Sequence, residues 1–204
     1  TNNIMEIIET VNGVQKQINC SVCGTSDIHI NGMEGPYSLI LIDGMPIMSS
    51  LSTVYGLNGI PTSLIKQIEI IKGPSSTLYG TEAVAGVINI ITKRPQDISK
   101  LEFDSFLSSD MEKNVDFSWS PKWDKADMLI SANLFHMNHF MDDNGDGFSD
   151  EVLSERISVF NKWAFHRKSG RIFDFSAKYY FEDRFGGTEN WTSEYKGSDS
   201  IYGE

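Results

Sequence analysis

The stretch IEIIKGPSSTLYGTEAVAGVINIITK, residues 68–93, decides the N-terminal fold. It holds two apolar runs on either side of a patch of small residues, and Gly73-Pro74 breaks the first run. Gly and Pro end strands sharply, and small side chains let one backbone pass close to another. We therefore predict two strands joined by a closely packed segment. Its small residues are Ser75, Ser76, Gly80, Ala83, Ala85 and Gly86.

A short helix and a small buried sheet are expected around this stretch. An apolar stripe at helical spacing, which predicts a short amphipathic helix, consists of Ile4, Ile7, Ile8 and Val11. Short runs that are apolar on both faces predict strands, at 27–30, 38–42, 68–71 and 86–91. The segment PTSLIKQ, residues 61–67, predicts at least one helical turn, because Pro61 suits the first helical position.

After residue 96 the pattern changes to aromatic-rich segments that alternate two kinds of side chain at period two. In residues 172–183, Phe173, Phe175 and Tyr179 fall on one face, while Asp174 and Lys178 fall on the other. Similar segments lie at 101–107, 115–120, 127–137 and 157–165. Their lengths suit membrane-spanning β-strands of ~9–11 residues, and they also suit a soluble antiparallel sheet with one wet face. The alternation alone leaves both interpretations open.

Composition excludes some functions. The chain has 204 residues, with 28 acidic and 17 basic side chains and a formal net charge of −11. Such a chain repels phosphate backbones, so nucleic acid is not expected as a partner. The N-terminus TNNIMEIIET lacks the basic-then-apolar pattern of a signal peptide. Because the sequence starts at Thr1 rather than Met and ends abruptly at SIYGE, residues 200–204, we expect a processed or truncated piece.

The segments LILIDGMPI (39–47) and IPTSLIKQIEIIKGPSSTLYGTEAVAGVINIITKRP (60–95) carry a series of motifs. These are an Asp-Gly-x-Pro turn, Ile-Glu-x-x-Lys-Gly-Pro, Leu-Tyr-Gly, and Gly-x-x-Asn-x-x-x-Lys. The series resembles the plug domain of TonB-dependent outer-membrane receptors. The resemblance implies an α+β fold, with a small plug domain of mixed sheet and short helices at 1–96 and antiparallel strands at 97–204. Those strands would begin an outer-membrane β-barrel of about 22 strands, which is incomplete in this chain.

Within the plug, the matched residues are expected to have structural roles. Glu69 and Lys72 are predicted to pair with charges on the barrel wall, in ionic contacts that transport could break and remake. Gly44 permits positive φ in a turn after Asp43. The full set of matched residues is Asp43, Gly44, Glu69, Lys72, Gly73, Pro74, Tyr79, Gly80, Gly86 and Asn89.

Ligand contact is assigned to the loops that would form the apices of the plug. By their order along the chain, these are the loop at 20–24, GMEG at 32–35 and MPIMSSLSTVYGL at 45–57. The candidate ligand-binding residues are Met33, Glu34, Gly35, Met48, Ser49 and Tyr55.

The acidic segment DDNGDGFSD, residues 142–150, matches part of a calcium-loop pattern. Oxygen ligands at alternating positions can wrap one hard cation, and Gly147 stands where the pattern needs a sharp turn. Leu153 replaces the expected bidentate Glu, so a plain hydrophilic hairpin loop is the alternative. The candidate calcium ligands are Asp142, Asn144, Asp146, the Phe148 carbonyl and Asp150. No other cofactor is expected.

The motif CSVC, residues 20–23, admits three interpretations. A thioredoxin-like site would need a helix after the motif, and zinc would need two more ligands, of which only His29 is near. A Cys20–Cys23 disulfide fits best, because an envelope protein experiences oxidising conditions.

The resemblance implies a transport receptor rather than an enzyme. The plug would gate a barrel in the outer membrane of a Gram-negative bacterium and help to bind a scarce extracellular nutrient, namely an iron chelate, haem, cobalamin or a glycan. Expected partners are the rest of the barrel, a surface lipoprotein, and TonB through a segment absent from this chain. The alternatives are a plug-based recognition or signalling module and a calcium-stabilised surface binding protein. A fragment of this kind could also have been produced as a soluble piece.

Overall fold

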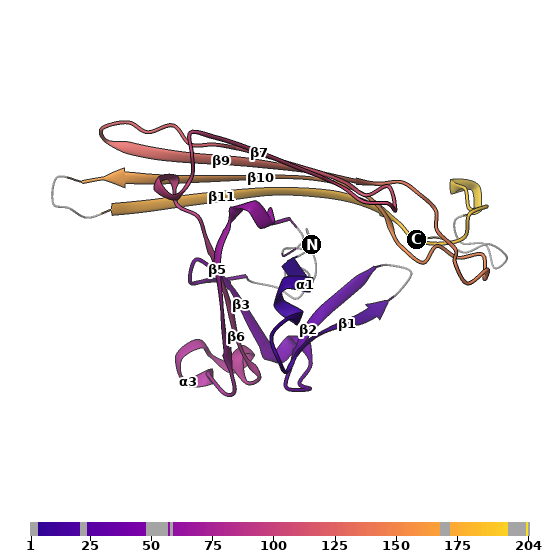
Figure 1. Ribbon diagram of the computed structural model, residues 1–204. Helices are drawn as coiled ribbons and strands as arrows, with labels where there is room; N and C mark the ends of the chain where they lie inside the picture. Colours follow the sequence, from indigo (N-terminus) through magenta and orange to yellow (C-terminus); the bar gives the residue numbers. More distant parts are fainter. Residues whose placement is uncertain are drawn as a thin grey trace.

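The computed structural model describes residues 4–20, 24–47, 57, 59–167, 172–195 and 203. Two parts are evident in Figure 1: the plug, residues 4–97, and a long five-stranded sheet that lies across it, which we call the wall. No helix in the described part is long and apolar enough to cross a membrane.

The wall is an antiparallel meander in the order β11-β10-β9-β8-β7. Its strands are β7 (Leu101–Leu107), β8 (Lys113–Trp119), β9 (Ala126–Met137), β10 (Leu153–His166) and β11 (Ile172–Phe185). Residues 108–112 and 138–152 connect strands at one end, which we call the loop end, and residues 120–125 connect strands at the opposite, turn end. All five strands were predicted from period-two alternation, and the bounds of β7 match the prediction.

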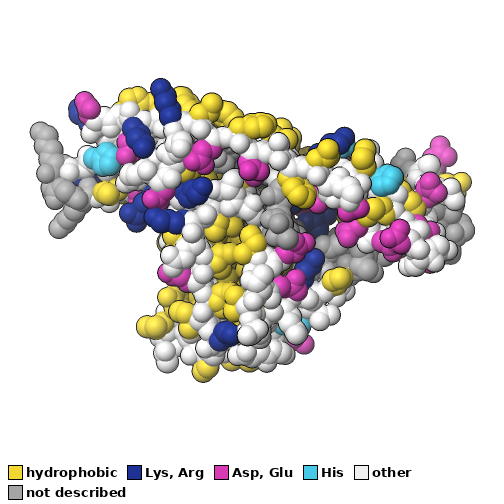
Figure 2. Space-filling view, viewed as in Figure 1, with side chains coloured by type: hydrophobic (Ala, Val, Ile, Leu, Met, Phe, Trp, Pro, Cys, Tyr) yellow, Lys and Arg dark blue, Asp and Glu magenta, His cyan; other side chains and the backbone are white. Residues whose placement is uncertain are grey.

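The two faces of the wall differ in chemistry. The face toward the plug is mostly polar: the Ser118 hydroxyl donates to Ser131 Oγ at 2.9 Å, and Asn133 donates to Asn114 Oδ1 at 2.7 Å. Leu129 and Phe160 interrupt it where they pack against Leu64 of the plug. The opposite, outer face exposes large apolar side chains, among them Phe173 and Phe181. Figure 2 shows hydrophobic side chains along the edge of the molecule that points away from the plug.

The plug contains two sheets. A hairpin joins β1 (Val14–Cys20) to β2 (Thr25–Ile30), and a mixed sheet has the order β4-β3-β6-β5. In the mixed sheet, β3 (Ser38–Ile42) runs parallel to β6 (Gly86–Thr92), while β4 (Met45–Pro46) and β5 (Ile65–Lys72) run antiparallel to their neighbours. This confirms the predicted mixed sheet. The expectation that all four predicted runs share one sheet is wrong, because β2 pairs with β1 instead.

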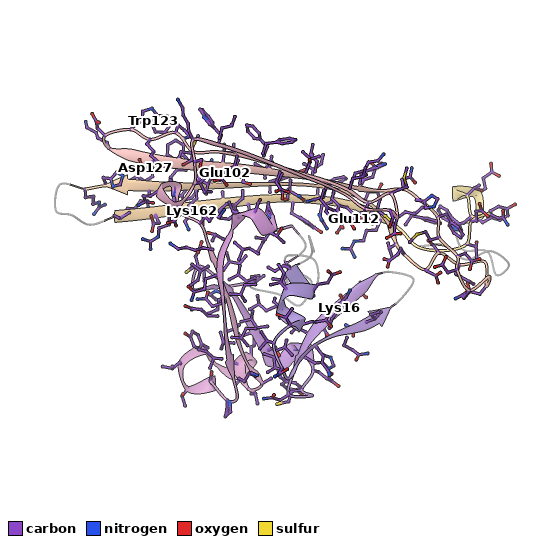
Figure 3. The ribbon with its side chains drawn as sticks, viewed as in Figure 1. Lys16, Glu102, Glu112, Trp123, Asp127 and Lys162 are labelled. Atoms are coloured by element: carbon purple, nitrogen blue, oxygen red, sulfur yellow. The ribbon has the colours of Figure 1, made fainter. Side chains whose placement is uncertain are left out.

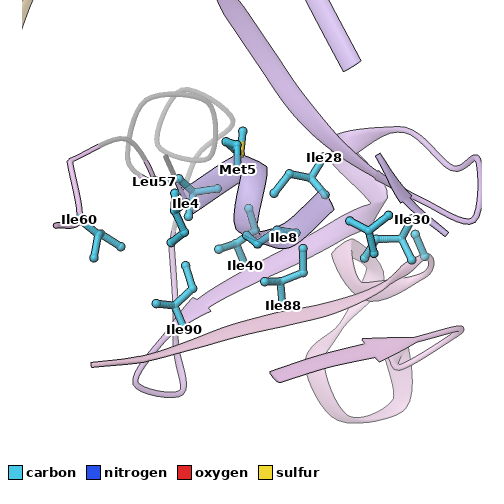
Figure 4. Packing of buried hydrophobic residues seen from close by; sticks show 12 residues of the cluster. Ile4, Met5, Ile8, Ile28, Ile30, Ile40, Leu57, Ile60, Ile88 and Ile90 are labelled. Atoms are coloured by element: carbon cyan, nitrogen blue, oxygen red, sulfur yellow. The ribbon is translucent and has the colours of Figure 1, made fainter. Parts of the chain in front are cut away.

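The plug core forms where one helix packs on both sheets. Helix α1 (Ile4–Glu9) buries Ile4, Met5 and Ile8 against Ile28 of β2 and Ile88 of β6 (Figure 4). Ile7, predicted to be on the buried stripe, is 36% exposed, and Met5 is buried in its place. Because α1 is only six residues long, the packed side is set by Ile4, Met5 and Ile8 rather than by a longer helical stripe.

Short helical turns complete the plug. They are the 3-10 turns η1 (Gly35–Tyr37), η2 (Thr62–Leu64), η3 (Thr81–Ala83) and η4 (Pro95–Asp97) and the helix α3 (Ser76–Tyr79), with η5 (Ser193–Tyr195) beyond the wall. The predicted helical turn at 61–67 is confined to η2, and Ile65 already begins β5. Strand β5 is also largely exposed, unlike the strand buried on both faces that its sequence predicted.

The glycines of the 68–93 stretch have different roles. A Cβ on Gly86 would collide with the carbonyl oxygen of Ile71 on the neighbouring strand, so this position needs close backbone approach. A Cβ on Gly73 or Gly80 would meet nothing within 4 Å, but both have positive φ, +98° and +89°. The expectation of close packing at Gly80 is therefore wrong, because left-handed backbone is what favours glycine there.

We predict that Gly86→Ala opens the β5–β6 ladder. The added methyl overpacks a backbone contact, which costs about 1–3 kcal/mol. Hydrogen exchange of the β5 and β6 amides should accelerate in the complete protein. The control is Gly32→Ala, where φ is +79° and no atom lies within 4 Å of the added Cβ. Unchanged β5 exchange in Gly86→Ala would contradict this account.

Candidate functional site

A cavity of about 590 Å³ lies between the plug and the loop end of the wall. Helix α1 and the β1–β2 hairpin form its plug side, and the ends of β9, β10 and β11 with their loops form the other. Figure 3 places Lys16 and Glu112 on these two sides. The plug-side lining is Ile4, Met5, Glu6, Lys16, Ile18, Gly24, Thr25, Ser26 and Ile60. The wall-side lining is Phe106, Asp110, Glu112, Phe135, Met137, Met141, Asp150, Glu151, Val152, Ser154, Arg156, Glu182 and Arg184.

Two arginines on adjacent strands give the cavity a basic cluster. Arg156 lies opposite Glu182 in the β10–β11 register, and its guanidinium is 3.7 Å from the Glu182 carboxylate. Arg184 contacts the same carboxylate at 2.7 Å, and Ser154 donates to it at 2.8 Å. Tyr180 also donates to Glu182. Two guanidinium groups that share one carboxylate leave a net positive charge, which suits an anionic group on a ligand.

The Arg156 side chain is fixed by an aromatic ring. Its guanidinium carbon lies 4.3 Å from the centre of the Phe135 ring, within the range of a cation–π contact. In the described part of the chain, no hydrogen-bond partner reaches the buried Nε of Arg156. Arg184 also contacts the plug, because it donates to the Gly24 carbonyl at 3.2 Å. The cluster therefore connects the wall, the β1–β2 hairpin and the cavity.

The mouth of the cavity is acidic. Figure 2 shows acidic side chains gathered where the plug meets the loop end of the wall. Burial raises the pKa of the Glu112 carboxyl above its ordinary value of 4.5, and the negative charge of Glu6 on α1 raises it further. Glu151 and Asp110 add to the increase, while Arg156 opposes it. Plug and wall thus bring like charges together across the cavity.

We predict that Glu112→Gln stabilises the complete protein at neutral pH. Ionised Glu112 costs stability in the folded state, because its folded pKa lies above its unfolded value. The gain should be present above the folded pKa and disappear as pH falls below about 4.5, where both states are protonated. Thermal unfolding midpoints at pH 7 and pH 4 test this. An equal gain at both pH values would point to packing rather than charge.

A second plug–wall contact lies nearer the turn end. Lys162 of β10 is buried, and its Nζ lies 2.9 Å from Asp43 Oδ2 and 3.0 Å from Thr92 Oγ1 (Figure 3). Asp43 also accepts from the Thr92 amide at 2.9 Å and from the Thr92 hydroxyl at 2.7 Å. We call this group the Lys162 latch. It ties the Asp43-Gly44 turn of the plug to the wall.

Hydrogen bonds extend from the latch into the plug sheet. The Gly44 amide donates to Asn89 Oδ1 at 3.0 Å, and Asn89 donates to Glu69 at 3.1 Å. Lys72 donates to the Asn12 carbonyl. Among the described residues these partners of Glu69 and Lys72 belong to the plug, and the predicted pairing of both with wall charges stays a prediction. In the same described part of the chain, Asp43 is a plug carboxylate that does pair with a wall charge, that of Lys162.

We predict that Lys162→Met loosens the Asp43-Gly44 turn. Removing one partner of a buried ion pair costs about 3–5 kcal/mol, and the Asp43 side chain is 26% exposed, so the lower end applies. Hydrogen exchange of the Gly44 and Thr92 amides should accelerate at least roughly tenfold. Lys122→Met, at an exposed lysine of the turn end, is the matched control. If both variants exchange alike, the latch does not hold the turn.

The three candidate ligand residues that the structure describes, Met33, Glu34 and Gly35, are not among the described residues that line this cavity. Met33 packs on the plug core, and Gly35 lies beside the side chain of Asp27, in the middle of the β1–β2 hairpin. Glu34 lies between them in the sequence. Ligand contact by Met33, Glu34 and Gly35 stays a prediction. The other three candidate ligand residues, Met48, Ser49 and Tyr55, lie outside the described residues. Cys23 also lies outside them, and the side chain of Cys20 is not described, so the predicted disulfide stays a prediction.

The acidic loop is organised by its own backbone. Asp142 accepts from the amides of Gly145 at 2.8 Å and Gly147 at 2.8 Å, and Asp146 accepts from the Phe148 amide at 2.8 Å. The Asp143 amide donates to Asp150, and Asn144 donates to Asp150 at 3.4 Å. In the described ranges, no group of three or more His, Cys, Asp or Glu side chains is placed to hold a metal ion. Calcium binding stays a prediction.

Sequence reasoning missed Arg156, Arg184 and Lys162. A signal was available, since all three have the strand parity of the polar, plug-facing positions. Arg156 and Lys162 share the face of Ser158 on β10, while Ile157 and Val159 face outward. A charged side chain on the polar face of an alternating strand marks the side toward the plug.

Comparison with known proteins gives three consistent findings. Residues 1–87 match the family model of the TonB-dependent Receptor Plug Domain. The ferric enterobactin receptor PirA of Pseudomonas aeruginosa is 38% identical over 109 residues, which are 47% of this chain and 15% of that protein. The vitamin B12 transporter BtuB of Vibrio vulnificus is 29% identical over 133 residues, 65% of this chain and 22% of that protein.

Solved structures show the same fold. A mutant of the ferric enterobactin receptor PfeA from Pseudomonas aeruginosa, in complex with enterobactin, has a TM-score of 0.70 at 22% identity. The match covers 95% of this chain and 33% of that one. The siderophore receptor PirA from the same organism has a TM-score of 0.64 at 25% identity, over 91% and 34% of the two chains. The chain thus spans about a third of these solved relatives. All are receptors or transporters, so the prediction that the chain is no enzyme is confirmed.

Proposed function

Because this chain belongs to the TonB-dependent outer-membrane receptors, we propose that the complete receptor imports a large metal chelate, a ferric siderophore or a cobalamin. The observation that carries the proposal is the cavity between the plug and the loop end of the wall, with Arg156 and Arg184 inside it. Its volume lies in the range of ligand-binding pockets, about 300–1,000 Å³. Haem and glycans remain the less favoured ligands.

The cavity offers contacts suited to such a chelate. Apolar side chains from both sides, including Met5, Ile60 and Phe106, can cover the hydrophobic part of a ligand. The guanidinium groups of Arg156 and Arg184 can bind an oxygen-rich anionic group through charge-assisted hydrogen bonds. Because the lining comes from plug and wall together, a bound ligand would contact both. A ligand in this position can report its presence to the plug directly.

Movement of the plug would complete import. The Lys162 latch and the Arg184–Gly24 contact are among the polar contacts that tie the plug to the wall, and Leu64 also packs on Leu129 and Phe160 of the wall. Water can replace the polar contacts when the parts separate. We infer that TonB, from which the family takes its name, supplies the force that separates them. The plug would then open a path past the wall.

We predict that Arg156→Gln weakens chelate binding at least about tenfold, because a hydrogen bond to a charged group contributes about 1.5–3 kcal/mol. The probes are ferric enterobactin and cyanocobalamin, with binding followed by tryptophan fluorescence of the complete receptor and uptake by cells that depend on it. Arg167→Gln, at an exposed arginine of the turn end, is the matched control. If cells with the unaltered receptor take up neither probe, the proposed ligand class is wrong.

A further inference from the structure

The cavity between the plug and the wall is acidic overall, although it contains a basic cluster. Six carboxylates and three basic groups belong to its described lining. The carboxylates are those of Glu6, Asp110, Glu112, Asp150, Glu151 and Glu182, and the basic groups are those of Lys16, Arg156 and Arg184. The carboxylates remain in excess even when Glu112 is protonated. Because a cleft concentrates the field of the charges that line it, this lining disfavours a ligand with a large negative charge.

The two signs of charge occupy different parts of the cavity. The guanidinium groups of Arg156 and Arg184 lie 3.7 Å and 2.7 Å from the Glu182 carboxylate, so these three side chains together carry a net positive charge. The carboxylates at the mouth have no such compensation. In the described part of the chain, no Lys, Arg or His side chain forms an ion pair within 4.0 Å of Glu6 or Glu112. An anionic ligand is therefore attracted by the arginines and repelled at the mouth.

The mouth carboxylates come from both the plug and the wall. Glu6 is carried by helix α1, whereas Glu112 directly precedes β8 and Glu151 lies in the loop before β10. Burial raises the pKa of the Glu112 carboxyl, and the negative charge of Glu6 raises it further. Glu151 and Asp110 act in the same direction, although Arg156 opposes them. These charges are therefore near enough to repel one another, and they repel a negative charge on a ligand from both sides of the cavity.

We propose that Glu6, Glu112 and Glu151 determine specificity by excluding polyanionic chelates, so that the ligand is a chelate of low net charge with a single anionic group. Arg156 and Arg184 bind that group, and their charge-assisted hydrogen bonds outweigh the more distant repulsion. A chelate with several negative charges makes this contact with one of them, while every charge meets the repulsion. The inference rests on the proposed import of a metal chelate, and it specifies the charge of the chelate that is imported.

Two probes of different charge test the proposal in the complete receptor: cyanocobalamin, which has a single phosphate and is neutral overall, and ferric enterobactin, which is a trianion. Cyanocobalamin should bind at least about tenfold more tightly at low ionic strength. Glu6→Gln and Glu112→Gln should each strengthen the binding of ferric enterobactin at least about threefold, because each removes one repelling charge, and leave the binding of cyanocobalamin unchanged. Asp124→Asn removes the same charge at the exposed turn end and should change neither.

Ionic strength separates repulsion from differences in shape. Salt screens charges over a Debye length of about 10 Å at about 0.1 M, so added salt should strengthen the binding of ferric enterobactin to the unaltered receptor and affect Glu112→Gln less. A purely structural role of Glu112 would not produce this difference. Tighter binding of ferric enterobactin than of cyanocobalamin, or binding of ferric enterobactin that salt weakens, would overturn the selection and leave the proposed import intact. Binding of neither probe would overturn both.

Discussion

A strand places successive side chains on opposite faces, and the rest of this structure depends on that constraint. Each wall strand must satisfy lipid on one face and a folded plug on the other. On β10 the outward Ile157 and Val159 therefore alternate with the inward Arg156, Ser158 and Lys162. The polar inner face gives the plug hydrogen-bond partners, and the outer face excludes water. One sequence pattern thus sets both surfaces.

Charge between plug and wall is concentrated at a few positions. Lys162 is buried, so it needs the Asp43 carboxylate and the Thr92 hydroxyl. The Arg156–Glu182–Arg184 cluster carries a net positive charge next to the cavity, and an anionic ligand could neutralise that charge. At the mouth, Glu6 and Glu112 repel each other across the same gap. The wall therefore holds the plug at the latch and through Arg184, while the carboxylates at the cavity mouth oppose close approach.

The sequence predicts strands far better than the site, for a physical reason. Strand β3 (Ser38–Ile42) has its predicted bounds because a dense apolar run stands between breakers. Strand β1 was missed because VQKQINC has no such run and is held by its pairing with β2. The cavity joins Lys16, Phe106 and Arg156. Their proximity depends on how plug and wall dock, which no local pattern encodes.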